Sequence, residues 1–189
     1  MNNKLIILSA PSGSGKTTIA KRLLESGMNL EFSVSATSRP KRYYETEGKD
    51  YYFLSAENFK EKIDNGEFLE WVEVYKNCFY GTLKSEADRI WNNGNNIVFD
   101  VDVIGGVNIK KLYKEKALLI FIMPPSIEVL EERLRKRGTE TEKTLKIRID
   151  RAKMELTYKD KFDKIIINDD LETAVKETIT LVKDFIDKK

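Results

Sequence analysis

Residues 5–18 read Leu-Ile-Ile-Leu-Ser-Ala-Pro-Ser-Gly-Ser-Gly-Lys-Thr-Thr, and this stretch decides the fold. Its start, Leu5–Leu8, is short, apolar and partly β-branched, which favours an interior parallel strand, and residues 19–24 have the pattern of an amphipathic helix. A glycine-rich loop that joins a strand to a helix and ends in Lys16 and Thr17 is typical of a phosphate-binding loop. A glycine-rich turn with a chance lysine is the alternative interpretation.

The chemistry of this loop suits nucleotide phosphates. Gly13 and Gly15 permit backbone angles that other residues avoid, so amides can point toward phosphate oxygens beside a partly positive helix N-terminus. Lys16 would neutralise the β- and γ-phosphates, and the Thr17 hydroxyl would hold Mg²⁺. ATP contacts are therefore expected from Pro11, Ser12, Gly13, Ser14, Gly15, Lys16, Thr17 and Thr18. Ala10 stands where the pattern usually has glycine, which matters only if the backbone there is left-handed.

Composition excludes several other function classes. The 189 residues include 33 basic and 31 acidic side chains, so the net charge of +2 provides no overall field for DNA or RNA. Histidine is absent, which excludes Ser–His and Cys–His catalytic pairs and imidazole metal sites. Cys78 is the only cysteine, and no targeting segment or membrane-length apolar run is recognisable. We therefore expect a cytoplasmic protein without membrane contact, and the sequence leaves open whether it forms a homo-oligomer.

Four short apolar segments alternate with longer helical or mixed segments. They are residues 5–8, 97–99, 118–122 and 165–167. This alternation predicts an α/β fold in which helices cover both faces of a parallel sheet. Residues 32–82 interrupt it with short alternating runs rich in tyrosine, serine and threonine, which predict an inserted lobe with antiparallel sheet. The expected parts are a core of residues 1–31, 83–125 and 156–189, the lobe of residues 32–82, and a lid of residues 126–155.

The lobe carries cations and phenols that suit a small phosphate ester. Arg39 and Arg42 follow a predicted strand, and Pro40 disfavours helix at Arg39. A guanidinium can bind two phosphate oxygens, and the hydroxyls of Tyr51 and Tyr80 can donate to others. The tyrosines could instead be half-buried strand residues. Both arginines are expected to lack an acidic partner at helical spacing.

An apolar run that ends in a carboxylate follows the lobe. Asp100 ends the strand predicted at residues 97–99, where phosphate-loop enzymes place an acid near the metal, so it is a candidate Mg²⁺ ligand, directly or through water. Asp102 would point to the same side of an extended strand, so both carboxylates could face a cleft between donor and acceptor.

Two helices are predicted to form the lid. The first spans residues 126–137 and stops at Gly138, and the second is expected to begin at Thr139, with Thr139 and Glu142 at capping-box spacing. Helices that meet at a glycine can form a hinged cover.

Lid closure would bring Arg137 and Arg148 onto a transferring phosphoryl group, where positive charge stabilises the transition state. The alternative is a solvated pair of charged helices, with Glu131, Glu132 and Asp150 as partners of the arginines.

These motifs resemble those of the guanylate kinases, enzymes that transfer a phosphoryl group from ATP to GMP. The resemblance runs along nearly the whole chain, through the phosphate-binding loop and residues 35–42, 48–51, 68–71, 80–82, 100–102, 137–142 and 168–171. It implies a Mg²⁺-dependent kinase of the P-loop superfamily that acts in purine nucleotide metabolism, by direct in-line transfer without a covalent intermediate. Its partners would be ATP and GMP.

The resemblance also implies roles for single residues. The GMP site would comprise Ser35, Arg39, Arg42, Tyr51, Glu70, Tyr80, Thr82, Asp100 and Asp102. Glu70 would accept from guanine N1 and the exocyclic amine, whereas adenine would place an unpaired acceptor against the carboxylate. Arg133 and Asn168 would contact ATP, Asn168 at the adenine. The catalytic residues would be Lys16, Arg42, Arg137 and Arg148.

Some of these positions have other interpretations. Without the resemblance, Glu70 would be an exposed strand residue, and residues 168–170 would only cap a terminal helix that begins at Leu171. Family members often carry glutamine where this chain has Ile104, before Gly105 and Gly106.

Two other functions stay open. The first is a guanylate-kinase-like interaction module that binds phosphopeptides, although this chain keeps the loop and lid residues that such modules lose. The second is a kinase for another small phosphate ester, such as a ribose phosphate. Only Glu70, Ser35 and Thr82, which the resemblance assigns to guanine binding, favour GMP over such a substrate.

Overall fold

The larger sheet of the protein is parallel, as predicted. The computed structural model describes residues 4–138 and 141–188, and its five-stranded sheet has the order β2-β7-β1-β8-β9. These strands are β1 (Leu5–Ser9), β2 (Leu30–Phe32), β7 (Asn96–Asp100), β8 (Ala117–Met123) and β9 (Lys164–Ile167). All four predicted strands are confirmed. β2 was not predicted as a strand of this sheet, because it is a short, half-buried edge strand without a continuous apolar run.

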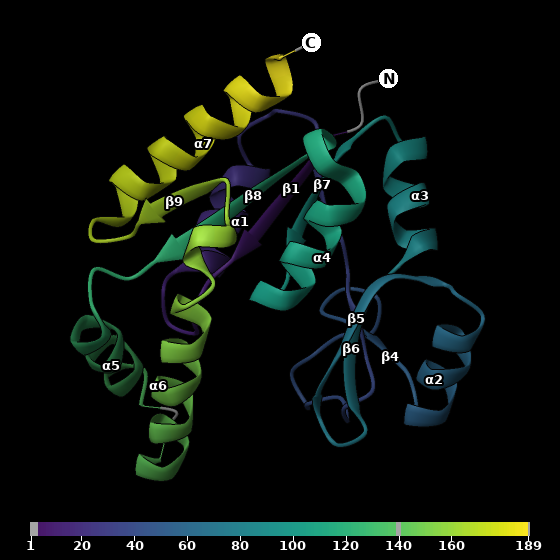
Figure 1. Ribbon diagram of the computed structural model, residues 1–189, viewed down its shortest axis with the longest axis horizontal. Helices are drawn as coiled ribbons and strands as arrows, with labels where there is room; N and C mark the ends of the chain where they lie inside the picture. Colours follow the sequence, from purple (N-terminus) through teal and green to yellow (C-terminus); the bar gives the residue numbers. More distant parts are fainter. Residues whose placement is uncertain (1–3, 139–140, 189) are drawn as a thin grey trace.

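Helices cover both faces of this sheet (Figure 1). One face packs against α1 (Lys16–Leu24) and α7 (Leu171–Asp187), and the other against α3 (Lys84–Asn92) and α4 (Val103–Tyr113). Successive residues of β1 point to opposite faces, so Ile6 and Leu8 join the first core cluster while Leu5 and Ile7 join the second. All five residues of β1 are buried, which explains its unbroken apolar sequence.

The lobe forms a separate four-stranded sheet with the order β4-β3-β6-β5. Its elements are β3 (Ala36–Thr37), β4 (Tyr52–Phe53), α2 (Ala56–Asp64), β5 (Phe68–Tyr75) and β6 (Cys78–Leu83). The predicted antiparallel pairing is confirmed for β3 with β6 and for β5 with β6, whereas β3 and β4 are parallel. The lobe has its own small core, in which Phe59 stacks on Phe68 with ring centroids 4.3 Å apart.

The lid consists of α5 (Ile127–Lys136) and α6 (Glu142–Leu156). The Ser126 side chain caps α5 by accepting from the Val129 amide, and Gly138, at φ +65°, follows its last turn, as predicted. The predicted start of α6 at Thr139 lies outside the described residues. The capping box is formed by Thr141 and Thr144 instead, because each side chain accepts from the backbone amide of the other.

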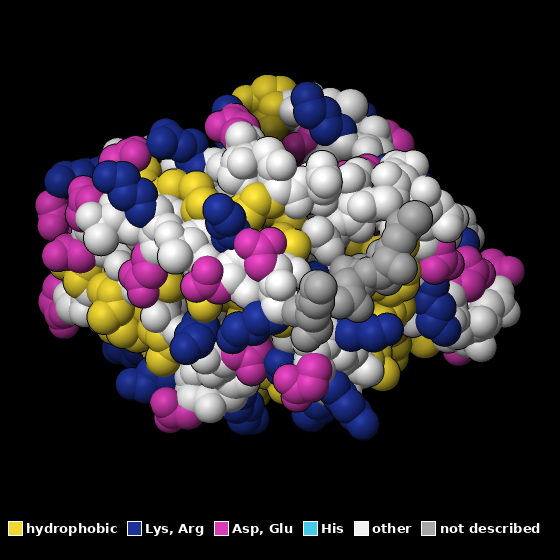
Figure 2. All heavy atoms as spheres, turned by 90° about the horizontal axis from the view of Figure 1, so that it is seen from above, with side chains coloured by type: hydrophobic (Ala, Val, Ile, Leu, Met, Phe, Trp, Pro, Cys, Tyr) yellow, Lys and Arg dark blue, Asp and Glu magenta, His cyan; other side chains and the backbone are white. Residues whose placement is uncertain are grey.

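Two short 3₁₀ turns complete the chain, η1 (Lys114–Lys116) and η2 (Lys159–Lys161). The lobe and the lid extend from the same end of the large sheet and face each other. Both termini lie at the opposite end (Figure 1). Basic and acidic side chains are interspersed over the face shown in Figure 2, which agrees with the small net charge. Within the described ranges, no helix is long and apolar enough to cross a membrane.

Candidate active site

The phosphate-binding loop lies between β1 and α1 and depends on two glycines. Gly13 and Gly15 have φ of +98° and +87°, in the region that side chains disfavour. A Cβ at Gly15 would also lie 2.2 Å from Asn168 Nδ2. Among the described residues other than glycine, only Asn29, Asn77 and Lys114 have positive φ. Ala10 therefore has an ordinary backbone, and alanine is tolerated at this position.

Lys16 is held at the ends of two neighbouring strands. Its ammonium group forms an ion pair with Asp100 at the end of β7, and it donates to the Val101 carbonyl at 3.4 Å. The pairing of Leu8 with Asp100 in adjacent parallel strands explains this proximity. The predicted metal carboxylate and the loop lysine are thus in contact.

Asp102 does not lie in a strand, contrary to expectation. β7 ends at Asp100, and Asp102 is the N-cap of α4, where its Oδ1 accepts from the Gly105 amide at 2.7 Å. Asp100 and Asp102 therefore do not share the extended strand that we predicted. Both residues nevertheless line the same cleft.

A cleft of about 890 Å³ lies between the loop, the lobe and the lid. It brings together predicted site residues from all three parts. They are Pro11, Ser12, Gly13, Gly15, Lys16, Thr17, Thr18, Ser35, Arg42, Tyr51, Glu70, Tyr80, Asp100, Asp102, Arg133, Arg137 and Arg148. Four other predicted residues, Ser14, Arg39, Thr82 and Asn168, are not part of its lining.

Glu70 is buried in the lobe wall of this cleft. Its side chain accepts from the Thr82 hydroxyl at 2.9 Å, and a Cβ at Gly105 would lie 2.7 Å from its Oε2. Burial, helped by the negative charge of Asp102 and opposed by the hydrogen bond from Thr82, raises the pKa of Glu70 to about 7. The exposed-strand interpretation was wrong, since Glu70 lies on the same inward face of β5 as Phe68 and is 7% exposed.

Tyr51 and Tyr80 are both half-buried, and both line the cleft. They therefore fit the interpretation as half-buried residues and also the one as residues of the cleft. Their rings meet edge to face with centroids 5.9 Å apart. Burial also raises the pKa of Tyr51, which keeps its hydroxyl protonated and able to donate.

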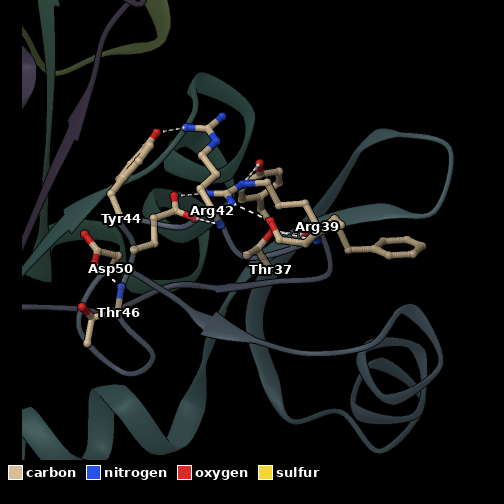
Figure 3. A network of polar contacts seen from close by, with 10 residues as sticks. Thr37, Arg39, Arg42, Tyr44, Thr46 and Asp50 are labelled. Atoms are coloured by element: carbon tan, nitrogen blue, oxygen red, sulfur yellow. Dashed lines mark hydrogen bonds and ion pairs between the residues drawn. The ribbon is translucent and has the colours of Figure 1, made fainter.

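The two lobe arginines differ in their surroundings. Arg39 Nη1 and Nη2 donate to Glu45 at 2.7 and 2.5 Å, and its Nε donates to the Tyr80 hydroxyl at 3.2 Å. Glu45 follows Arg42 by three residues, so the expectation of no acidic partner at helical spacing was wrong for Arg42. Arg39 is six residues away, and a turn in which the Glu45 amide donates to the Arg42 carbonyl at 3.1 Å brings the carboxylate back to both arginines. Arg42 donates to the Tyr44 hydroxyl at 2.9 Å (Figure 3) and lines the cleft.

Three lid arginines lie near the loop. Arg148 donates to the Ser12 hydroxyl at 2.7 Å, and Arg133 donates to the Asp169 carbonyl at 3.3 Å. Arg137 is the C-cap of α5. The carboxylates Glu131 and Glu132, considered as partners of these arginines, pair with Arg135 and Lys136 instead.

Asn168 lies at the floor of a second pocket, of about 270 Å³, with Gly13, Gly15, Thr18 and Arg133. Its Nδ2 donates to the Ser14 carbonyl at 2.7 Å, and its buried Oδ1 has no hydrogen-bond partner among the described groups. Asp170 caps α7 by accepting from the Thr173 amide. Asp170 therefore provides the helix cap, whereas Asn168, two residues earlier, lines the second pocket.

Sequence reasoning missed three charged residues of the site, namely Glu45, Arg151 and Glu155. Arg151 Nε donates to Glu155 Oε1 at 3.0 Å, and both line the cleft. They follow Arg148 at spacings of three and seven residues, so helical periodicity could have placed them on the same face. Burial raises the pKa of Glu155 despite the opposing effect of Arg151 and Lys16.

A parallel sheet with a glycine loop at a helix N-terminus, and a lysine beside a strand-end carboxylate, defines a P-loop nucleotide-binding protein. The family described as "Guanylate kinase" matches residues 2–188 of the sequence. The chain belongs to the guanylate kinase family.

Named relatives agree with this assignment. A guanylate kinase of Bacteroides thetaiotaomicron is 52% identical over 189 residues, which is all of this chain and 93% of that protein. One of Porphyromonas gingivalis is 52% identical over 186 residues, covering 98% of this chain and 99% of the other. The crystal structure of guanylate kinase from Anaplasma phagocytophilum is 31% identical, with a TM-score of 0.78, and the match covers 99% of this chain and 88% of that one.

Proposed function

We propose that this protein transfers the γ-phosphoryl group of ATP to GMP, giving ADP and GDP. The observation that carries the proposal is the shared cleft, because the buried residue Glu70 and the loop residue Lys16 both line it. A buried carboxylate suits guanine because N1 and the exocyclic amine are both donors. Family membership supports the same reaction.

The donor would bind at the phosphate-binding loop. Backbone amides of residues 11–18 and the N-terminus of α1 suit the phosphates, with Lys16 at the β- and γ-positions. The adenine would lie in the pocket beside Asn168 and Arg133. The unpartnered Asn168 Oδ1 supports this, because the adenine amine is a donor that could satisfy it.

The residues present fit a magnesium ion. The Thr17 hydroxyl and the Asp100 carboxylate are hard oxygen ligands at the same cleft, and the described residues hold no larger group of acidic, cysteine or histidine ligands. Two protein oxygens suit Mg²⁺, which usually keeps several waters and substrate phosphate oxygens. When bound, the ion would neutralise charge on the phosphates.

The acceptor would bind against the lobe. Glu70, supported by Thr82 and Ser35, would hold the guanine together with Asp100 and Asp102, which line the same cleft. Arg39, Arg42, Tyr51 and Tyr80 would hold the phosphate.

Transfer would need positioning and charge neutralisation rather than a base, since the attacking phosphate oxygen is already anionic. Lys16, Arg42, Arg137 and Arg148 would surround the transferring group. We also propose that the core, the lobe of residues 32–82 and the lid of residues 126–155 move as three parts, so that closure excludes water.

The test is product analysis with ATP, Mg²⁺ and GMP. The proposal predicts that GDP and ADP form in equal amounts, that chelation by EDTA stops both, and that little ADP forms without GMP. ADP without GDP would show an ATPase instead, and binding of GMP without turnover would favour an interaction module.

A further inference from the structure

We infer that Glu45 is a positioning residue that holds the binding site for the acceptor phosphate in its working shape. The inference rests on the proposed function, because it concerns the residues assigned to the phosphate of GMP. Glu45 lies in the segment between β3 and β4 and is 8% exposed. A carboxylate this buried needs partners, and both of its partners are the arginines of that site.

The contacts of Glu45 join the two arginines. Its Oε1 accepts from Arg39 Nη2 at 2.5 Å, and its Oε2 accepts from Arg39 Nη1 at 2.7 Å and from the Arg42 backbone amide at 2.8 Å. The two-pronged pair fixes the plane of the guanidinium. Pairing with Arg39 also lowers the pKa of Glu45 to about 2, so the carboxylate stays charged at neutral pH.

Arg39, held by Glu45, in turn contacts both tyrosines of the site. Its Nε donates to the Tyr80 hydroxyl at 3.2 Å, and its guanidinium carbon lies 4.9 Å from the ring centroid of Tyr51. An arginine has five N–H donors. Tyr80, the Pro40 carbonyl and the two oxygens of Glu45 take four of these donors, which leaves one N–H of Arg39 for a ligand.

Arg42 is arranged differently. Its backbone amide is fixed by Glu45, whereas its guanidinium contacts the Tyr44 hydroxyl and lines the cleft (Figure 3). Glu45 therefore anchors the base of Arg42 and leaves its charged end available. A site ordered before the ligand arrives loses less side-chain freedom on binding.

The negative charge of Glu45 also acts in the opposite direction, because it repels an anionic phosphate. If charge alone mattered, its removal would strengthen GMP binding. If Glu45 instead positions the arginines, its removal would weaken GMP binding. The direction of the change in GMP affinity therefore distinguishes charge repulsion from positioning.

The experiment uses Glu45→Gln and measures kcat and the KM values for GMP and ATP. We expect the KM for GMP to rise about tenfold, the effect of losing one charged hydrogen bond to the ligand. The KM for ATP should change by less than about twofold, and Glu45→Asp should recover part of the loss. The matched control is Glu47→Gln, since Glu47 lies in the same segment, is exposed, and accepts from the Phe53 amide rather than from an arginine.

Two further measurements separate positioning from a general distortion of the lobe. Inhibition by guanosine, which lacks the phosphate, should be nearly unchanged in Glu45→Gln. In an Arg39→Ala background, Glu45→Gln should change the KM for GMP much less than in the wild type, because residues that act through one another are not additive.

An unchanged or lower KM for GMP in Glu45→Gln would overturn the inference, as would an equal loss of guanosine inhibition. Failure of the proposed function is a separate result, because wild-type protein would then form no GDP in the same assay.

Discussion

At the scale of single residues, the site depends on charges that are held in place by neighbours. Lys16 contacts Asp100, Arg148 contacts Ser12, and Arg151 contacts Glu155. All three cations line the cleft, so these contacts hold its positive groups in place, among them Lys16 and Arg148, which are proposed for phosphoryl transfer.

Replacement of Lys16 tests the loop directly. Lys16→Met removes the charge at the β- and γ-phosphates while keeping most of the side-chain length, so kcat should fall by about a hundredfold or more. GMP binding should stay nearly intact, because the lobe does not use this side chain. Steady-state kinetics and GMP titration measure the two effects, and near-normal turnover would contradict the assigned role.

The raised pKa of Glu70 predicts a dependence of stability on pH. Its pKa rises from 4.5 to about 7 on folding, so the folded state retains a proton that the unfolded chain loses. This contribution to stability is fully present below pH 4.5 and is lost as the pH rises through 7. Between pH 5 and pH 8 it amounts to roughly 2.5 kcal/mol.

Urea unfolding of the ligand-free protein at both pH values, with Glu70→Gln as control, isolates this contribution. The variant has no proton to lose at residue 70, so the stability of the wild type relative to the variant should fall by that amount from pH 5 to pH 8. A constant difference would mean that Glu70 is not held in a dry environment.

Sequence reasoning succeeded at residues whose motif has a local cause and failed where the partner is distant or irregular. The positive φ of Gly13 and Gly15 and the cap at Ser126 follow from short patterns. The pair of Arg39 with Glu45 depends on a turn, which leaves no periodic signal.

At the scale of elements, the packing of α4 against β5 sets the position of Glu70. Gly105 lies at the start of α4, and a Cβ there would be 2.7 Å from Glu70 Oε2. Glycine at this position therefore allows the close approach of the Glu70 carboxylate, and a larger residue would have to displace it.

Gly105→Ala should displace either α4 or the Glu70 carboxylate. We expect a loss of about 1–3 kcal/mol in the free energy of unfolding, and a KM for GMP raised about tenfold with the KM for ATP little changed. Ile104→Ala is the matched control, since Ile104 is the preceding residue and is 37% exposed. If the KM for GMP does not change, the close contact has no part in guanine binding.

The elements predicted best were those with a continuous apolar run or a clear cap. β1, β7 and β8 are largely buried strands. β9 has a run of three isoleucines, of which Ile166 is buried, and α5 has a serine cap and a terminal glycine. β2 was missed because a three-residue edge strand carries little pattern.

At the scale of the whole molecule, the cleft separates the lobe from the lid. Phosphoryl transfer requires that the two substrates meet and that water be excluded, so both ligands together should close the cleft. Small-angle X-ray scattering should show a smaller radius of gyration with ADP and GMP than without ligands. Glu70→Gln, which should bind GMP weakly, should contract less at the same ligand concentrations.

No contraction of the wild-type protein at saturating concentrations of both ligands would contradict a moving lobe and lid. The relative position of these parts could not be obtained from the sequence. Local patterns fix each helix and strand, but not the distance across a solvent-filled cleft.

The choice of acceptor is tested by the ratio of kcat/KM among acceptors, measured by coupled ADP release with ATP and Mg²⁺. GMP, AMP, UMP, CMP and ribose 5-phosphate would be offered in parallel. The account predicts a preference for GMP of at least about 10⁴, because Glu70 would face an unpaired acceptor in adenine. Equal or better turnover of any other acceptor would contradict the role of the buried carboxylate.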